Sequence, residues 1–171
     1  MQRGFTLLEL LITLTVLVVF LTAAVPSYRT LIASQSMVAQ SNAFVSFLTS
    51  ARSEAITRSQ SVRACKSADE TACTVDGGWE QGGIAYVDTN DDGARNASSE
   101  PIVDVLSALE RATLTGGDDA TANSIRFGPH GFAVGSSGEL QLARDDTDDV
   151  NRICVSPSGA ISLHEAGGAC L

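Results

Sequence analysis

The chain begins with an apolar segment long enough to constrain how the rest of it can fold. Apart from Glu9, the 21 residues from Phe5 to Val25 carry no charged side chain. As a helix, which rises about 1.5 Å per residue, the segment extends roughly 30 Å, the thickness of a bilayer hydrocarbon core. A carboxylate at that depth costs about 2.5 to 3.5 kcal/mol, so Glu9 requires a positively charged partner.

Two simple interpretations explain only part of this segment. A cleaved secretory signal has a basic start, a short apolar core and a small-residue cleavage site, which Thr22-Ala-Ala24 imitates. That interpretation leaves Glu9 inside the apolar core and Pro26 close to the cut. A plain single-pass anchor accounts for the length, but it does not account for Gly4-Phe5-Thr6 together with Glu9.

The start of the chain resembles the class III signal of type IV pilins and type II secretion pseudopilins. The resemblance is carried by Gly4-Phe5 and by Glu9. It implies that residues 1–4 are a leader, that prepilin peptidase cleaves between Gly4 and Phe5, and that Phe5 is then N-methylated. It also implies that Glu9 neutralises the N-terminal ammonium of a neighbouring subunit during assembly.

The pattern after Val25 predicts that the helix continues. Pro26 lacks a backbone N–H, so it marks a kink or a local loss of helix. Over residues 26–60 apolar side chains recur at steps of three and four, including Phe44, Leu48, Ala51 and Ala55. We therefore expect one long helix with an apolar assembly half at 5–25 and an amphipathic half at 26–60 that packs on its own domain.

From Ser61 onward the period of the pattern changes to two, which predicts short β-strands. Gly, Pro, Asp or Ser bounds each of them. The expected strands are 61–66, 83–88, 101–106, 124–127, 132–134, 139–142, 151–156 and 160–163. The segments 116–119 and 145–149 are too polar to bury. A helix followed by closely spaced strands predicts an α+β head at 61–171, with an antiparallel sheet packed on the helix.

Four cysteines in an exported head indicate two disulfide bonds. Of the three possible connectivities, the sequence-local one joins Cys65 to Cys73 and Cys154 to Cys170. A zinc site would need closely spaced ligand pairs, which are absent, and the chain has only two histidines. We expect no cofactor.

The head narrows the resemblance to the GspH/FimT group of minor pilins and pseudopilins. The shared elements, in order, are Ala51-Arg-Ser-Glu-Ala55, Cys65, Trp79-Glu80, Asp88-Thr-Asn-Asp-Asp-Gly93 and Ser156-Pro-Ser-Gly159. No single element is specific, but their order is. The resemblance implies the pilin fold, in which a long N-terminal helix packs on an antiparallel β-sheet head.

The resemblance also implies a role and partners. The role is that of a noncatalytic minor pilin in the tip or assembly-priming complex of a type IV pilus, with a minor pseudopilin of a type II secretion system as the alternative. Its partners are other major and minor pilins, prepilin peptidase, an inner-membrane assembly platform and, before assembly, membrane lipid. The chain then crosses the bacterial inner membrane once, holds its head in the periplasm, and moves into a pilus or pseudopilus that can reach the cell surface.

One turn is a weak candidate for metal binding. Asp88, Asn90 and Asp92, followed by Gly93, match the opening of an EF-hand calcium loop. The twelfth position, however, is Ser99 instead of a bidentate glutamate. Because Asn, Asp and Gly tolerate left-handed geometry, the sequence favours a hairpin turn without metal.

A DNA-uptake role is the alternative from a different class. Loss of the leader removes Arg3, which leaves 10 basic side chains against 20 acidic ones. DNA-binding members resemble one another in a Gly-Arg-x-Arg segment, but Gly159-Ala-Ile-Ser162 has no arginine here. DNA binding would require the isolated cations Arg126, Arg144 and Arg152 to share one face. The acidic loops of the head disfavour nucleic acid.

No catalytic motif supports an enzyme. Gly135-Ser-Ser-Gly138 is not a nucleophile elbow, and neither His130 nor His164 lies in a catalytic signature. A triad built from distant residues remains open at the level of sequence.

Overall fold

The structure is a computed structural model that describes residues 6–145, 150–165, 168 and 170. Residues 146–149, most of the second polar loop expected from the sequence, lie outside the described part. The chain divides into two compact units, Met1–Ser36 and Met37–Leu171. The first unit contains the beginning of a long helix, and the second contains the rest of that helix and all the strands.

The long helix α1 is continuous from Leu7 to Arg58. The local loss of helix that we considered at Pro26 is not found, because the assignment runs through this position. Proline removes one N–H from the ladder, and the flanking hydrogen bonds can carry the helix across the gap. From Leu7 to Val25 the large apolar side chains are between 44% and 76% exposed.

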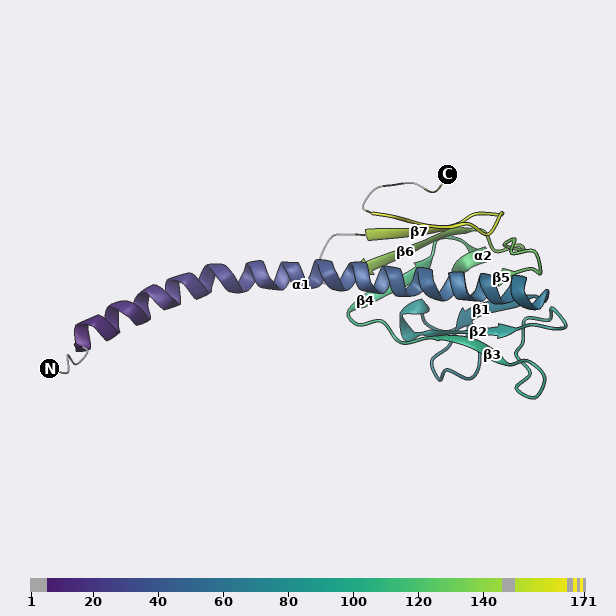
Figure 1. Cartoon of the computed structure of the whole chain (residues 1–171), viewed down its shortest axis with the longest axis horizontal. Helices are drawn as coiled ribbons and strands as arrows, with labels where there is room; N and C mark the ends of the chain where they lie inside the picture. The colour runs from purple at the N-terminus through teal and green to yellow at the C-terminus, as the bar shows by residue number, and fades with distance from the viewer. Residues whose placement is uncertain (1–5, 146–149, 166–167, 169, 171) are drawn as a thin grey trace. The chain divides into compact units, whose positions relative to one another are not determined.

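In the second unit, α1 packs on the strands through the predicted apolar stripe. Phe44, Leu48, Ala51 and Ala55 are all fully buried, which confirms the amphipathic pattern. Most of the remaining core comes from both sheets, which α1 crosses (Figure 1). Ser41, also on the buried face, accepts a hydrogen bond of 2.9 Å from the Asn151 amide.

The strands form two four-stranded antiparallel sheets, where the sequence had indicated one. Sheet A has the order β3-β2-β1-β5, and sheet B has the order β4-β6-β7-β8. The strands of sheet A are β1 (Val62–Lys66), β2 (Gly83–Val87), β3 (Ile102–Leu106) and β5 (Ser124–Phe127). Those of sheet B are β4 (Ala112–Gly116), β6 (Gly138–Arg144), β7 (Val150–Val155) and β8 (Ile161–His164).

Seven of the eight expected strands are present, and three elements were missed. The expected strand at 132–134 forms only an isolated bridge, between Ala133 and Phe127. The missed elements are β4, the short 3-10 helix η1 (Trp79–Gln81) and the one-turn helix α2 (Asp119–Ala122). The polar segment 116–119 therefore contains the end of β4 and the start of α2, and is not loop throughout.

Candidate functional site

The proposed assembly residues lie at the start of α1. Gly4 and Phe5 are outside the described residues, whereas Glu9 is exposed in the first helical turn. Thr6 Oγ1 accepts a hydrogen bond of 3.3 Å from the Glu9 N–H, and the Thr6 carbonyl accepts one of 3.2 Å from the Leu10 N–H. Thr6 is therefore the N-cap of α1. Glu9 stands at the third helical position, where a carboxylate interacts favourably with the helix dipole. The spacing Thr-x-x-Glu in the sequence could have predicted this N-cap.

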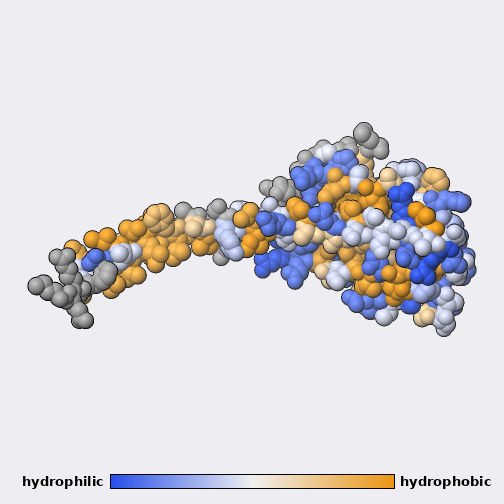
Figure 2. Space-filling view, viewed as in Figure 1, coloured by the Kyte–Doolittle hydropathy of each residue, from blue (hydrophilic) through white to orange (hydrophobic). Residues whose placement is uncertain are grey.

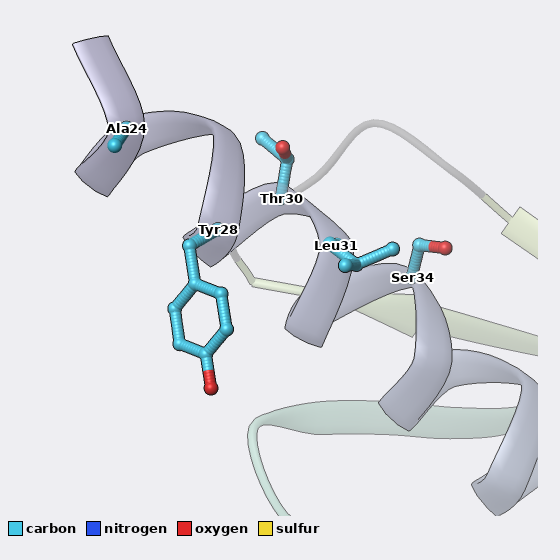
Figure 3. Close-up of a pocket in the computed structure, with 5 residues that line it drawn as sticks. All are labelled: Ala24, Tyr28, Thr30, Leu31 and Ser34. Atoms are coloured by element: carbon cyan, nitrogen blue, oxygen red, sulfur yellow. The ribbon is translucent and has the colours of Figure 1, made fainter. Parts of the chain in front are cut away.

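The described surface from Leu7 to Val25 is mostly apolar (Figure 2). An open hollow farther along α1 is lined by Ala24, Tyr28, Thr30, Leu31 and Ser34, with the Tyr28 ring extending away from the helix (Figure 3). Tyr28 is 65% exposed, so the hollow is a surface feature of one helix and does not enclose a ligand. No helix formed by the described residues is long and apolar enough to cross a membrane.

In the head, the Ala51-to-Ala55 motif joins α1 to two loops. Arg52 Nε donates to the Gly131 carbonyl at 2.9 Å, and Arg52 Nη2 donates to the Ser158 carbonyl at 3.2 Å. Gly159 has a φ of +77°, and a Cβ built on it would lie 1.9 Å from the Gly131 oxygen. The late Ser-Pro-x-Gly element is thus explained by close packing, because only glycine fits there.

The Trp79-Glu80 motif connects α1 with α2 and with β4 of sheet B. The Trp79 side chain is fully buried, packs edge-on against Phe44 with ring centroids 5.4 Å apart, and donates from Nε1 to the Thr121 carbonyl at 3.0 Å. Glu80 Oε2 accepts the Leu114 N–H of edge strand β4 at 3.1 Å. These residues stabilise the head, and no contact of theirs indicates a ligand.

Both sequence-local disulfide bonds are present. Cys65 is bonded to Cys73 and Cys154 to Cys170, each with a Cα–Cα distance of 5.6 Å. The first bond closes a loop after β1, and the second ties the end of the chain to β7.

The candidate metal turn belongs to the long connection between β2 and β3. Asp88 is buried, and its Oδ2 accepts a hydrogen bond of 2.8 Å from Arg63 Nε, whereas Asn90 and Asp92 are exposed and bonded to each other. Within the described residues, no three His, Cys, Asp or Glu side chains are grouped closely enough to hold a metal.

The three arginines that could have formed a basic face lie on two different sheets. Arg126 on β5 pairs with Asp91 at 2.9 Å. Arg152 on β7 has its Nε 3.0 Å from Glu139 Oε1, an ion-pair distance without hydrogen-bond geometry. Arg144, at the end of β6, is buried. Because Arg126 and Arg152 already pair with carboxylates, these cations offer little to a phosphate backbone.

The two histidines lie far apart in the sequence and differ in environment. His130 is exposed in the loop after β5, and His164 ends β8 with its Nε2 3.1 Å from Ser162 Oγ. We assign neither of them a chemical role.

Comparison with solved structures shows the same fold. The type IV minor pilin FimU of Pseudomonas aeruginosa matches with a TM-score of 0.63 and 16% identity, covering 81% of this chain and 95% of that one. The minor pseudopilin EpsH of the Vibrio cholerae type 2 secretion system matches with a TM-score of 0.52 and 15% identity, covering 77% and 97%. None of the curated proteins compared with this sequence matches it.

Two family descriptions match the sequence itself. Residues 1–25 match the prokaryotic N-terminal methylation motif, and residues 40–159 match the type II transport protein GspH. The second match spans most of the chain, and it agrees with the α+β pilin fold. The family consists of membrane-anchored structural subunits of pili and pseudopili, which assemble with other pilins or pseudopilins. This chain belongs to the GspH family and is a GspH/FimT-type minor pilin or pseudopilin.

Proposed function

We propose that the chain is a minor pilin that waits in the bacterial inner membrane and is then incorporated into a type IV pilus, in its tip or assembly-priming complex. The observation that carries this proposal is the pairing of an N-methylation motif at 1–25 with a GspH head at 40–159. The exposed apolar side chains of the first unit support it, because they need either lipid or neighbouring helices to cover them.

The proposed mechanism is assembly by helix packing. Prepilin peptidase removes residues 1–4, Phe5 is N-methylated, and the segment from Phe5 to Val25 anchors the subunit once across the membrane with its head in the periplasm. On assembly, this segment exchanges lipid for neighbouring helices. The Glu9 carboxylate then pairs with the Phe5 amine of an adjoining subunit, which fixes register and offsets the cost of burying the charge.

The processing step is tested by the mass of the protein recovered from membranes. Replacing Gly4 with leucine places a bulky side chain at the scissile bond, so we expect a product that retains residues 1–4. The matched control is Gln2→Leu, which makes the same change away from that bond and should still yield a chain that begins at Phe5. Normal maturation of the Gly4→Leu variant would contradict the proposal.

The match to FimU favours a pilus, and the match to EpsH favours a secretion pseudopilus. A minor pseudopilin of a type II secretion system is therefore the alternative function. The two are separated by recovering the tagged full-length protein from sheared surface filaments. We expect it among pili, and we expect that recovery to require the pilus assembly platform. Recovery that depends instead on the secretion platform would assign the chain to the pseudopilus and leave the processing proposal untouched.

A further inference from the structure

Exposed apolar side chains gather near the end of α1. Among the described residues of the second unit, the exposed large apolar side chains are Val38, Ile56, Val75, Val105, Phe132 and Val134. Ile56 lies in the last turn of α1, and Phe132 and Val134 lie in the loop after β5. We call these three residues the distal patch. Single exposed apolar side chains are ordinary, whereas a group of them indicates an interaction surface.

Two glycines show that the side chains of the distal patch border the same loop. A Cβ built on Gly131 would lie 2.7 Å from Ile56 Cδ1, and one built on Gly128 would lie 3.2 Å from Val134 Cγ2. Phe132 follows Gly131 directly, and its carbonyl accepts a hydrogen bond of 2.9 Å from the Gly128 N–H. The distal patch is thus built on one turn of the backbone beside the end of α1.

The backbone that carries Phe132 is held from two directions. The Ala133 N–H donates to the Pro157 carbonyl at 3.1 Å, and the Val134 N–H donates to the Arg126 carbonyl of β5 at 2.9 Å. Ala133 is buried in the core. Because side chains alternate along an extended segment, Phe132 and Val134 point away from the core. An aromatic side chain on a fixed backbone loses little entropy when a partner buries it.

Two elements shared with the family support this loop. Arg52 donates hydrogen bonds to the Gly131 and Ser158 carbonyls, and Gly159 leaves room for the Gly131 carbonyl. These contacts explain how the loop is held, but not why it presents a phenylalanine to solvent. Phe132 is 55% exposed, so much of its ring surface is available for burial by another molecule.

The charged side chains beside Ile56 on α1 are already bonded within the head. Glu54 and Arg58 lie on either side of Ile56 in the sequence and pair with each other, and Arg52 engages the two loop carbonyls. The distal patch therefore offers little to a phosphate or to a metal ion. Its chemistry suits an apolar protein surface.

The position of the distal patch argues against lipid as its partner. The second unit begins at Met37, and Ile56 lies about 28 Å further along α1, at a rise of about 1.5 Å per residue. In the proposed function the membrane is on the side where α1 enters the head. The distal patch is at the opposite end, where a subunit that entered the filament earlier would lie.

We propose that the distal patch binds the head of a different pilin, the neighbour on the tip side of the filament. Phe132 is the anchor that an apolar surface of that head buries, and Ile56 and Val134 exclude water around it. The inference rests on the proposed function and deepens it, because it assigns a contact to the head in addition to the packing of the apolar helices. Aromatic residues are enriched at the buried centres of such interfaces.

The test compares full-length variants by their recovery in sheared filaments, each normalised to the amount in membranes. Phe132→Ala should lower this recovery at least about fivefold, as truncation of an interface anchor does. Val134→Ala should lower it less. The matched control is Val75→Ala, the same change at an exposed valine in the loop after β1, and it should leave recovery unchanged. Equal recovery of the Phe132→Ala and Val75→Ala variants would overturn the inference.

Photocrosslinking gives a second readout, which decides the question if Phe132→Ala is lost from membranes. A benzoyl-phenylalanine in place of Phe132 keeps an aromatic ring, and illumination should link it to the head of a different pilin, identified from the crosslinked peptides. A link to lipid or to a second copy of this chain, or no link, would overturn the inference. Absence of the wild-type chain from filaments would instead contradict the proposed function. A link to another pilin or pseudopilin head formed in membranes would then still support the inference, and no link there would overturn it.

Discussion

At the scale of single residues, the family elements of the head are explained by packing. Arg52 donates hydrogen bonds to two loop carbonyls, and the buried Trp79 donates one to the carbonyl of Thr121. Gly159 leaves room for the Gly131 carbonyl, at a backbone angle that other residues rarely adopt. The sequence showed that these residues occur in a family order, but the contacts that make them necessary join segments far apart in the chain.

The packing at Gly159 can be tested with two alanine substitutions. Gly159 and Gly135 both have positive φ, but a Cβ at Gly135 would meet nothing within 4 Å. Gly135→Ala should therefore cost only the backbone strain, about 1 to 2 kcal/mol of unfolding free energy. Gly159→Ala adds a clash with backbone and should cost about 1 to 3 kcal/mol more. Urea unfolding of both full-length variants measures these costs. Equal losses of unfolding free energy would show that the close approach of the Gly131 carbonyl adds nothing to the cost at Gly159.

At the scale of elements, periodicity predicted what depends on local pattern. The buried stripe from Phe44 to Ala55 and seven strands follow directly from apolar spacing. Strand β4 alternates buried and exposed residues, but its small Ala-Thr-Leu-Thr-Gly sequence gave too little hydrophobic signal. The division into two sheets depends on pairings such as β4 with β6, which local sequence does not encode.

The two disulfide bonds should stabilise different elements. Replacing Cys154 and Cys170 with serine frees the segment after β7, so we expect a loss of about 2 to 4 kcal/mol and faster amide exchange in β8. The same double change at Cys65 and Cys73 is the matched control, and its faster exchange should be confined to β1 and the loop after it. Exchange in β8 that is the same in both variants would contradict this assignment.

At the scale of the whole molecule, the head is stabilised by its own contacts, whereas the apolar part of the helix needs other molecules to cover it. The head has its own core, two disulfide bonds and paired charges. The described side chains before Met37 offer an apolar surface that other molecules must cover. The chain has a formal net charge of −9, which disfavours DNA as the covering partner. Lipid and other pilin helices are the remaining candidates, in agreement with the family.

We propose that the charge of Glu9 selects the subunit for assembly. Because Glu9 also stands in the capping turn of α1, an alanine variant alone cannot separate charge from capping. Glutamine keeps the capping capacity and removes the charge, and Thr6→Val removes the cap while keeping the charge.

The most direct measurement compares how much wild-type, Glu9→Gln and Thr6→Val protein reaches sheared filaments, each normalised to the amount in membranes. We expect Glu9→Gln to insert normally but to fall at least about tenfold in filaments, which corresponds to about 1.4 kcal/mol of lost pairing. Thr6→Val should remain close to wild type. Wild-type incorporation of Glu9→Gln, with a defect in Thr6→Val, would show that the Thr6 cap and not the Glu9 charge governs incorporation, and would contradict the proposed pairing.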